Sequence, residues 1–266
     1  MTKTVSSVIV VIPARYGSSR FPGKPLVALG RKSMIQHVYE QAAACRMVTE
    51  VLVATDDDRI KQAVEGFGGH AVMVAGDYRT GTDRVAGAAR MFGGQYFVNL
   101  QGDEIPLHPD LLADLIEPFL KSDAGMGTLK RTIDSTEDVH NPSVVKVVSD
   151  QFGNALYFSR APIPLVRDDA GRRAVAGLHY IHLGLYMYRR DTLLNLASLP
   201  TGRLEEAEKL EQLRALENGI PIRVWETAHR SLRVDTPEDV ESAAEKLQQF
   251  DGVEQESGAL KAAPFR

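Results

Sequence analysis

A run of branched apolar residues near the start of the chain limits the fold more than any other feature. Val8–Ile12 shows no polar alternation and leads into Pro13, which is typical of a strand buried on both faces of a parallel sheet. Strand and helix patterns then alternate up to about residue 100. The expected strands are Glu50–Ala54, Ala71–Val74 and Tyr96–Leu100, and the expected helices are Ser33–Ala44, Asp57–Phe67 and Thr82–Met91. This alternation predicts an α/β fold with a mainly parallel sheet flanked by helices.

The pattern changes after Ser122, where strands are expected without helices between them. These strands are Met126–Thr132, Val144–Ser149, Ala155–Ser159 and Leu183–Tyr188. They predict a small β extension of the main sheet, over about residues 126–190. The whole of residues 1–250 is expected to form a single domain, and residues 251–266 a loose tail.

Three further elements are expected before that tail. Leu204–Glu217 has the period of a long amphipathic helix, with Leu204, Ala207, Leu210 and Leu213 on one face. Ile222–Glu226 is an expected strand, and Pro237–Gln249 is an expected closing helix.

Composition excludes several classes of protein. The chain has 31 Lys and Arg against 35 Asp and Glu, a net charge of −4, and no basic run, which argues against nucleic-acid or anionic-membrane binding. Its longest apolar runs fall far short of the roughly 20 residues of a spanning helix. The single cysteine, Cys45, excludes an intrachain disulfide and a multi-cysteine metal site. A soluble cytoplasmic protein is the expectation.

The segment Pro13–Pro25 is the first candidate site. It follows a buried strand and holds two glycines and the cations Arg15, Arg20 and Lys24. Glycine amides and cations together suit a polyphosphate. The spacing is not that of a P-loop, and a solvated basic loop is the alternative. The end of the first parallel strand favours ligand binding.

Two acidic segments are the other candidates. Asn99–Glu104 follows a predicted strand, so Asp103 is expected at the carboxyl edge of the sheet, where a divalent metal could link it to phosphate. A tight turn that uses the aspartate structurally is the alternative. In Val234–Val240, Thr236 and Pro237 form an ordinary helix start. Asp235 is then either a neighbour of this cap or a second metal carboxylate.

Taken together, the motifs resemble those of the 3-deoxy-manno-octulosonate (Kdo) cytidylyltransferase family in order and spacing, over about residues 7–246. The matching segments are Ile12–Leu26, Ala54–Asp57, Gly81–Arg84, Leu100–Glu104, Val145–Val148, Ala155–Arg160, Pro162–Pro164, His182–Tyr186, Leu210–Arg214 and Val234–Pro237. The resemblance implies a nucleotide-diphosphosugar-transferase fold, with a mixed, mainly parallel sheet flanked by helices, and a homodimer. It implies CTP and Kdo as substrates and Mg²⁺ as cofactor, in lipopolysaccharide biosynthesis.

The resemblance also implies roles for individual residues. Residues implied to bind CTP are Ala14, Arg15, Ser18, Arg20 and Lys24 near the triphosphate and Thr80 and Arg84 near cytosine. Asp103 and Asp235 are implied to bind Mg²⁺ and to form the catalytic set with Arg15 and Lys24. The residues implied to line the sugar-acid pocket are Gln101, Arg160, His182, Tyr186, Glu211 and Gln212.

Each sugar-side residue also has an ordinary structural interpretation. His182 and Tyr186 could be packed core residues, and Glu211 and Gln212 a solvated helix face. Arg160 is more informative, because a guanidinium pairs with a carboxylate through two bonds, although a structural salt bridge is its alternative. This chain departs from the family pattern at Ile105, beside Asp103, and at Thr80, where the family has serine.

The reaction implied by the resemblance is CTP + Kdo → CMP-Kdo + pyrophosphate, by in-line attack of the sugar 2-hydroxyl on the α-phosphorus. The motifs leave two alternatives open. One is the same chemistry on another ulosonic acid, such as an amino-Kdo or a sialic acid. The other is a nucleotide-binding regulatory protein without turnover. The presence of Arg15, Lys24, Asp103 and Asp235 argues against the second alternative.

Overall fold

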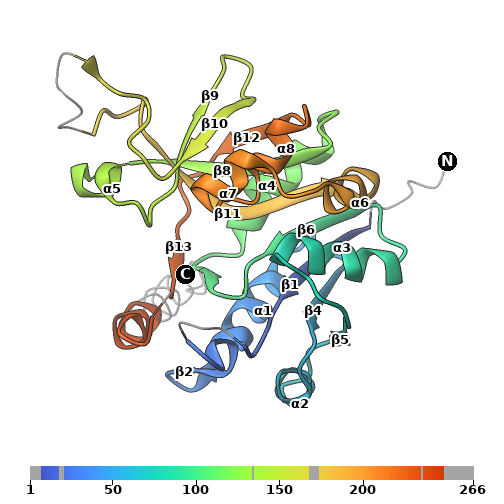
Figure 1. Ribbon diagram of the computed structural model, residues 1–266. Helices are drawn as coiled ribbons and strands as arrows, with labels where there is room; N and C mark the ends of the chain where they lie inside the picture. The colour runs from blue at the N-terminus through green and yellow to red at the C-terminus, as the bar shows by residue number, and fades with distance from the viewer. Residues whose placement is uncertain (1–6, 18–20, 134, 168–173, 235, 249–266) are drawn as a thin grey trace, which may run out of the picture.

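A nine-stranded mixed sheet forms the centre of the protein (Figure 1). The computed structural model describes residues 7–17, 21–133, 135–167, 174–234 and 236–248, so the expected tail lies outside the described residues. Among the described residues, no helix is long and apolar enough to cross a membrane.

The first half of the chain builds the parallel part of this sheet, as predicted. Strand β1 (Val8–Pro13) lies between β4 (Glu50–Thr55) and β6 (Tyr96–Leu100), and β5 (Ala71–Met73) pairs with β4; all these pairs are parallel. The chain therefore moves outward from β1 to β4 and β5, then returns to the other side of β1. The carboxyl ends of β1 and β6 flank this reversal, which is where open α/β sheets bind ligands.

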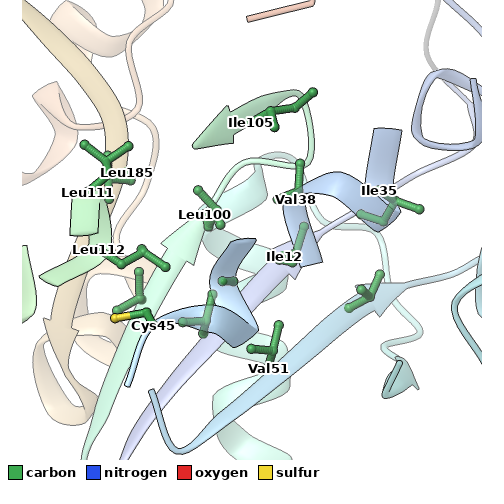
Figure 2. Packing of buried hydrophobic residues seen from close by; sticks show 14 of the residues in the cluster. Ile12, Ile35, Val38, Cys45, Val51, Leu100, Ile105, Leu111, Leu112 and Leu185 are labelled. Carbon is green, nitrogen blue, oxygen red and sulfur yellow. The ribbon is translucent and has the colours of Figure 1, made fainter. Parts of the chain in front are cut away.

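Side chains of β1 alternate between two hydrophobic clusters, one on each face of the sheet. Val8, Val10 and Ile12 pack with helices α1 (Met34–Ala44), α2 (Asp58–Gly66) and α4 (Asp110–Leu120), as Figure 2 shows in part. Ile9 and Val11 pack with α3 (Gly81–Met91) and α6 (Arg190–Ser198) on the opposite face. Burial on both faces explains why this strand lacks polar alternation.

The second half adds antiparallel strands. Strand β11 (Tyr180–Arg189) pairs antiparallel with β6 and with β8 (Met126–Thr132), and β12 (Ile222–Glu226) runs parallel to β8. Strands β9 (Lys146–Ser149) and β10 (Ala155–Ser159) form an antiparallel pair that joins near the start of β11. The remaining short elements are η1 (Lys24–Leu26), β2 (Ala28–Leu29), β3 (Lys32–Ser33), β7 (Glu104–Pro106), α5 (Thr136–His140) and β13 (Ser231–Arg233).

The expectation of strands without helices between them after Ser122 was wrong at one place, because the short helix α5 lies between β8 and β9; α6 follows the last of these strands. Helix α4 was also not predicted. Its apolar residues have helical spacing, since Leu111, Leu115 and Phe119 lie four residues apart and are buried. Pro118, one residue before the last buried side chain, hides this pattern because proline disfavours helix interiors.

The prediction of one long helix over Leu204–Glu217 was also wrong. The segment forms two short helices, α7 (Arg203–Glu208) and α8 (Leu213–Glu217), because Lys209 adopts a left-handed backbone with φ of 54°. Leu204 and Ala207 are exposed, whereas Glu205 is buried. Arg214 holds Glu205 through two hydrogen bonds of 2.8 and 2.6 Å, and it also donates to Asp83 over 2.9 Å.

The predicted closing helix is present over residues 239–248. It begins two residues later than predicted, after a turn in which the Thr236 amide donates to the Asp239 carboxylate over 2.8 Å.

Candidate active site

The loop after β1 folds back on itself before Lys24. The amide of Gly23 donates to the carbonyl of Tyr16 over 2.9 Å, and Gly23 has a φ of 72°. A Cβ atom at Gly23 would lie 3.2 Å from the Tyr16 ring, so a larger residue fits poorly here. The Arg59 guanidinium stacks 3.3 Å from the centroid of that ring. These contacts hold Gly23, and with it the adjacent Lys24, beside Tyr16.

Lys24 meets Asp103 at this edge. Its Nζ lies 2.7 Å from Oδ2 of Asp103, which follows β6. Both residues line a cavity of about 240 Å³ at the carboxyl ends of β1 and β6. The expected nucleotide-side residues that line the same cavity are Ala14, Arg15, Thr80 and Arg84. Ser18, Arg20 and Asp235 lie outside the described residues.

Thr80 and Arg84 lie at the start of α3, beside this cavity. The hydroxyl of Thr80 caps the helix by accepting the Asp83 amide over 3.1 Å, so the departure from serine keeps a working cap. Arg84 is buried and donates to Asp56 over 2.6 Å and to the Val74 carbonyl over 3.2 Å. These bonds fix the guanidinium and join two of the family motifs.

A second cavity, of about 470 Å³, opens beside the first. Four residues line both cavities: Gln101, Asp103, Glu211 and Arg233. Every residue expected at the sugar-acid pocket lines the second cavity, namely Gln101, Arg160, His182, Tyr186, Glu211 and Gln212. The predicted nucleotide-side and sugar-side residues therefore line two adjacent cavities that share Asp103.

His182 and Tyr186 lie on β11, where the strand is irregular. The pairing register with β8 shifts between Leu183 and Tyr186, and the Thr128 hydroxyl donates to the Leu185 carbonyl over 2.7 Å. Because that hydroxyl hydrogen is used, its oxygen accepts from Nε2 of His182 at 3.0 Å. Burial lowers the pKa of His182 to about 3, so the ring is neutral at pH 7. Burial also raises the pKa of Tyr186, which keeps its hydroxyl protonated.

Polar side chains connect the sugar side to α3. The Gln101 amide donates to Asn99 over 3.0 Å, and Asn99 donates to the Thr82 hydroxyl over 3.2 Å. Thr82 in turn donates to Glu211 over 2.8 Å. Gln212 is buried, and its Nε2 has no hydrogen-bond partner among the described residues. A buried donor of this kind suits a polar ligand.

Backbone carbonyl groups hold the guanidinium of Arg160. Its guanidinium donates to the carbonyls of Glu208 at 2.7 Å, Pro142 at 2.9 Å and Lys209 at 3.3 Å. Its own amide donates to the Glu208 carboxylate over 2.9 Å. These bonds use three of the five N–H groups and brace one wall of the second cavity. Pairing of Arg160 with a substrate carboxylate stays a prediction.

Ile105, at which the chain departs from the family pattern, is part of the hydrophobic core. Ile105 is fully buried on β7 against the α1 side of the sheet, as Figure 2 shows. The neighbouring Glu104 accepts the Gly184 amide over 3.1 Å and the Ser231 hydroxyl over 2.7 Å, and burial raises its pKa. These bonds tie the segment after Asp103 to β11 and β13.

The sequence did not single out four further cations that line the second cavity. They are Arg131, Lys209, Arg230 and Arg233. Arg233 stands two residues before Asp235, and that position was the only available signal. The others come from elements far apart in the chain. With Arg160 they outnumber the acids Asp103, Glu104 and Glu211, which favours an anionic ligand.

Comparison with known proteins places this fold in a class. Residues 9–226 match the family described as cytidylyltransferase. A solved structure from Bacillus anthracis, described as a putative glucose-1-phosphate thymidylyltransferase, shares the fold, with a TM-score of 0.62 and 16% identity over 92% of this chain and 99% of that one. The class is therefore that of the nucleotidyltransferases.

Nearer relatives give the particular family. The chain is 52% identical to 3-deoxy-manno-octulosonate cytidylyltransferase of Geobacter sulfurreducens, over 91% of this chain and 99% of the relative, and 47% identical to that of Solibacter usitatus, over 88% and 92%. A solved CMP:2-keto-3-deoxy-manno-octonic acid synthetase in complex with CTP superposes with a TM-score of 0.85, at 44% identity over 92% and 99% of the two chains. The chain belongs to the 3-deoxy-manno-octulosonate cytidylyltransferase family.

Proposed function

We propose that this protein transfers the cytidylyl group of CTP to Kdo and releases pyrophosphate, and that its product serves lipopolysaccharide synthesis in the cytoplasm. One observation carries the proposal. A cavity lined by Arg15, Lys24 and Arg84 opens onto a larger cation-rich cavity, and Asp103 stands where they meet. A nucleotide in the first and a sugar acid in the second would bring their reacting atoms together there.

In this account the first cavity binds CTP. Arg15, Ser18, Arg20 and Lys24 hold the triphosphate, and Ala14 lies against the nucleotide. Thr80 and Arg84 face the cytosine. Support comes from the fixed guanidinium of Arg84, which Asp56 holds at 2.6 Å. A fixed donor discriminates between bases better than a mobile one.

The second cavity binds Kdo through Gln101, Arg160, His182, Tyr186, Glu211 and Gln212. A sugar acid offers one carboxylate and several hydroxyls. The cations on the cavity wall suit the carboxylate, and the unpartnered Nε2 of Gln212 suits a hydroxyl. Neutral His182 and protonated Tyr186 add hydrogen-bonding groups without adding charge.

Asp103 and Asp235 are the proposed ligands of Mg²⁺. The side chain of Asp103 is 35% exposed at the junction of the cavities, and a carboxylate joined by substrate phosphates is the usual protein contribution to a Mg²⁺ site. When bound, Mg²⁺ would neutralise charge on the phosphate oxygens and lower the pKa of the attacking hydroxyl.

The chain's own residues then act by position and charge. Kdo is held so that its 2-hydroxyl oxygen attacks the α-phosphorus; a new P–O bond forms, and the bond to the β-phosphate oxygen breaks. The hydroxyl proton leaves to solvent, and pyrophosphate carries away the leaving charge. Arg15 and Lys24 stabilise that charge, which is the main contribution proteins make to phosphoryl-group transfer.

A homodimer is also part of the proposal. Strand β10 lies at one end of the sheet path, and its Leu156 is 62% exposed. Phe152 and Leu165, at 66% and 70% exposure, belong to the same expected β extension of the single domain. An exposed strand edge with apolar side chains favours pairing with a second copy. Light scattering of the wild type and of Leu156→Glu tests this, with a dimer and a monomer as the expected states.

Pyrophosphate release from CTP, with a panel of sugar acids, tests the function. Kdo is expected to give the highest kcat/KM, and omission of Mg²⁺ is expected to abolish release. Preference for a sialic acid or an amino-Kdo would assign the chain to another ulosonic acid. CTP binding without release on any sugar acid would indicate a regulatory nucleotide-binding protein.

A further inference from the structure

Two histidines meet at the end of the small ladder formed by β7 and β13. Pro106 pairs with Ser231 at the end of that ladder, and the Leu107 amide donates to the Arg230 carbonyl over 3.1 Å. The antiparallel register then brings His108 opposite His229. Their rings are stacked, with centroids 5.1 Å apart and an angle of 14° between the planes.

Two carboxylates from the first turns of α4 complete this cluster. Oδ2 of Asp110 lies 3.4 Å from Nδ1 of His108, and Oδ2 of Asp114 lies 2.9 Å from Nδ1 of His229. The Thr227 hydroxyl donates to the same oxygen of Asp114. Because a carboxylate only accepts, Nδ1 of His229 carries the proton and Nε2 keeps its lone pair. A carboxylate that orients a histidine in this way is the usual second contact of a metal-binding imidazole.

The spacing of the donor atoms suits a small transition metal. One ligand atom from each of His108, Asp110 and His229 lies within 4.8 Å of the others. Ligands of tetrahedral Zn²⁺ at about 2.0–2.1 Å from the metal stand roughly 3.4 Å apart. The pair of His108 and Asp110 already has this separation. Nδ1 of His108 accepts the Asp110 amide over 3.1 Å, so metal binding would replace that one bond.

We propose that His108, Asp110 and His229 bind a divalent transition metal such as Zn²⁺, with Asp114 as the residue that positions His229. Imidazole nitrogens favour Zn²⁺ over Mg²⁺, so this site would select a different ion from the one proposed at Asp103. None of the four residues is among those lining the two active-site cavities. The two histidines are half-buried and Asp110 is exposed, so a tetrahedral ion at this site would take its fourth ligand from solvent.

Such a metal would stabilise the ladder formed by β7 and β13, whose other end lies next to Asp103. Asp103 directly precedes β7, and its carbonyl accepts the amide of Val234, the residue after β13, over 3.2 Å. Cross-linking His108 to His229 closes the other end of the same ladder. Metal binding is therefore expected to stabilise the folded chain, by an amount that rises with the logarithm of the free metal concentration once this exceeds the dissociation constant.

Calorimetric titration of untagged, EDTA-treated full-length protein with ZnCl₂, in excess Mg²⁺, tests the site. The wild type is expected to bind one Zn²⁺ per chain. His229→Gln and His108→Asn are each expected to weaken binding more than tenfold, and Asp114→Asn by about 10–100-fold, as for other orienting carboxylates. The matched control is His70→Asn, which changes an exposed histidine paired with the single carboxylate of Glu50. Its binding is expected to equal that of the wild type.

Co²⁺ gives a readout that needs no variant. Binding of Co²⁺ to the wild type should produce the visible absorption of a tetrahedral ion, and Zn²⁺ should displace it. The proposal is overturned if the wild type binds no Zn²⁺, if Co²⁺ gives no such absorption, or if folded His229→Gln and His108→Asn bind like the control. Because these readouts are independent of turnover, they do not depend on the proposed reaction.

Discussion

The ammonium of Lys24 lies 2.7 Å from a carboxylate oxygen of Asp103. This ion pair joins segments that are 79 residues apart in the chain and that follow neighbouring parallel strands, β1 and β6. Each partner neutralises the other at the junction of the two cavities. In our account the same two groups bind ligands of opposite charge, since Lys24 faces phosphate and Asp103 faces Mg²⁺.

Asp103→Asn should abolish most turnover while leaving the fold intact. The amide keeps the shape of the side chain but removes the negative charge proposed to bind Mg²⁺. We expect kcat to fall by at least 100-fold, or about 2.7 kcal/mol of barrier. Asp123→Asn, at an exposed position, is the control and should retain full activity. A loss within tenfold, with circular dichroism unchanged, would contradict the role of Asp103.

Arg160→Lys should raise the KM for Kdo and leave the KM for CTP almost unchanged. Lysine keeps the charge but cannot reach the carbonyls of Pro142, Glu208 and Lys209 together, so the wall of the second cavity loses its brace. A loss of about 1–3 kcal/mol in kcat/KM for Kdo is expected. The exposed Arg203→Lys serves as control. Equal weakening of both substrates, or a lower melting temperature with unchanged kinetics, would indicate a purely structural residue.

Arg214→Met should strongly destabilise the protein. Arg214 is 1% exposed and holds the buried carboxylates of Glu205 and Asp83. Among the described residues, its removal leaves Glu205 with only the Gly202 amide, at 3.2 Å, and Asp83 with only the more distant Arg79, at 3.9 Å, to balance their charges. The expected loss is about 3–5 kcal/mol in the free energy of unfolding, measured by urea denaturation. Arg203→Met on the exposed surface of α7 should cost less than about 0.5 kcal/mol. Similar losses in both variants would mean that the buried network contributes little.

His182 should make the protein less stable in acid. The folded protein keeps this ring neutral down to a pKa of about 3, whereas the unfolded chain protonates it near 6.5. Stability from this group is therefore complete above about pH 6.5 and decreases as the pH falls from there toward 3. At pH 5 the loss is on the order of 2 kcal/mol. Urea denaturation of wild type and His182→Gln at pH 7.5 and 5 tests this. The variant should lose less stability between the two pH values, and an equal loss would contradict the assignment.

Local pattern was sufficient to predict the parallel half of the sheet. Val8–Ile12 lies between two strands and two helical layers, so every side chain is apolar and the run itself reveals its burial. The two loops after β1 and β6 were then predictable neighbours, because parallel strands place their carboxyl ends at one edge.

Long-range pairing explains what the sequence did not reveal. Glu205 is buried in place of Leu204 because Arg214 neutralises it, and Arg214 also pairs with Asp83, which lies 131 residues away in the chain. A helical period cannot signal such a partner. In the same way, the carbonyl partners of Arg160 come from the loop at Pro142 and from the end of α7, so its bracing role appears only once these segments are placed.

Phosphorus-31 NMR of CTP, Kdo and Mg²⁺ with the purified protein tests the central claim most directly. The account predicts that the three resonances of CTP disappear together. One phosphodiester resonance and one pyrophosphate resonance should replace them, and the second should have twice the intensity because pyrophosphate holds two equivalent phosphorus atoms. The phosphodiester product should have the mass of CMP-Kdo. Persistence of CTP, or its conversion to CDP and inorganic phosphate, would contradict cytidylyl transfer by this protein.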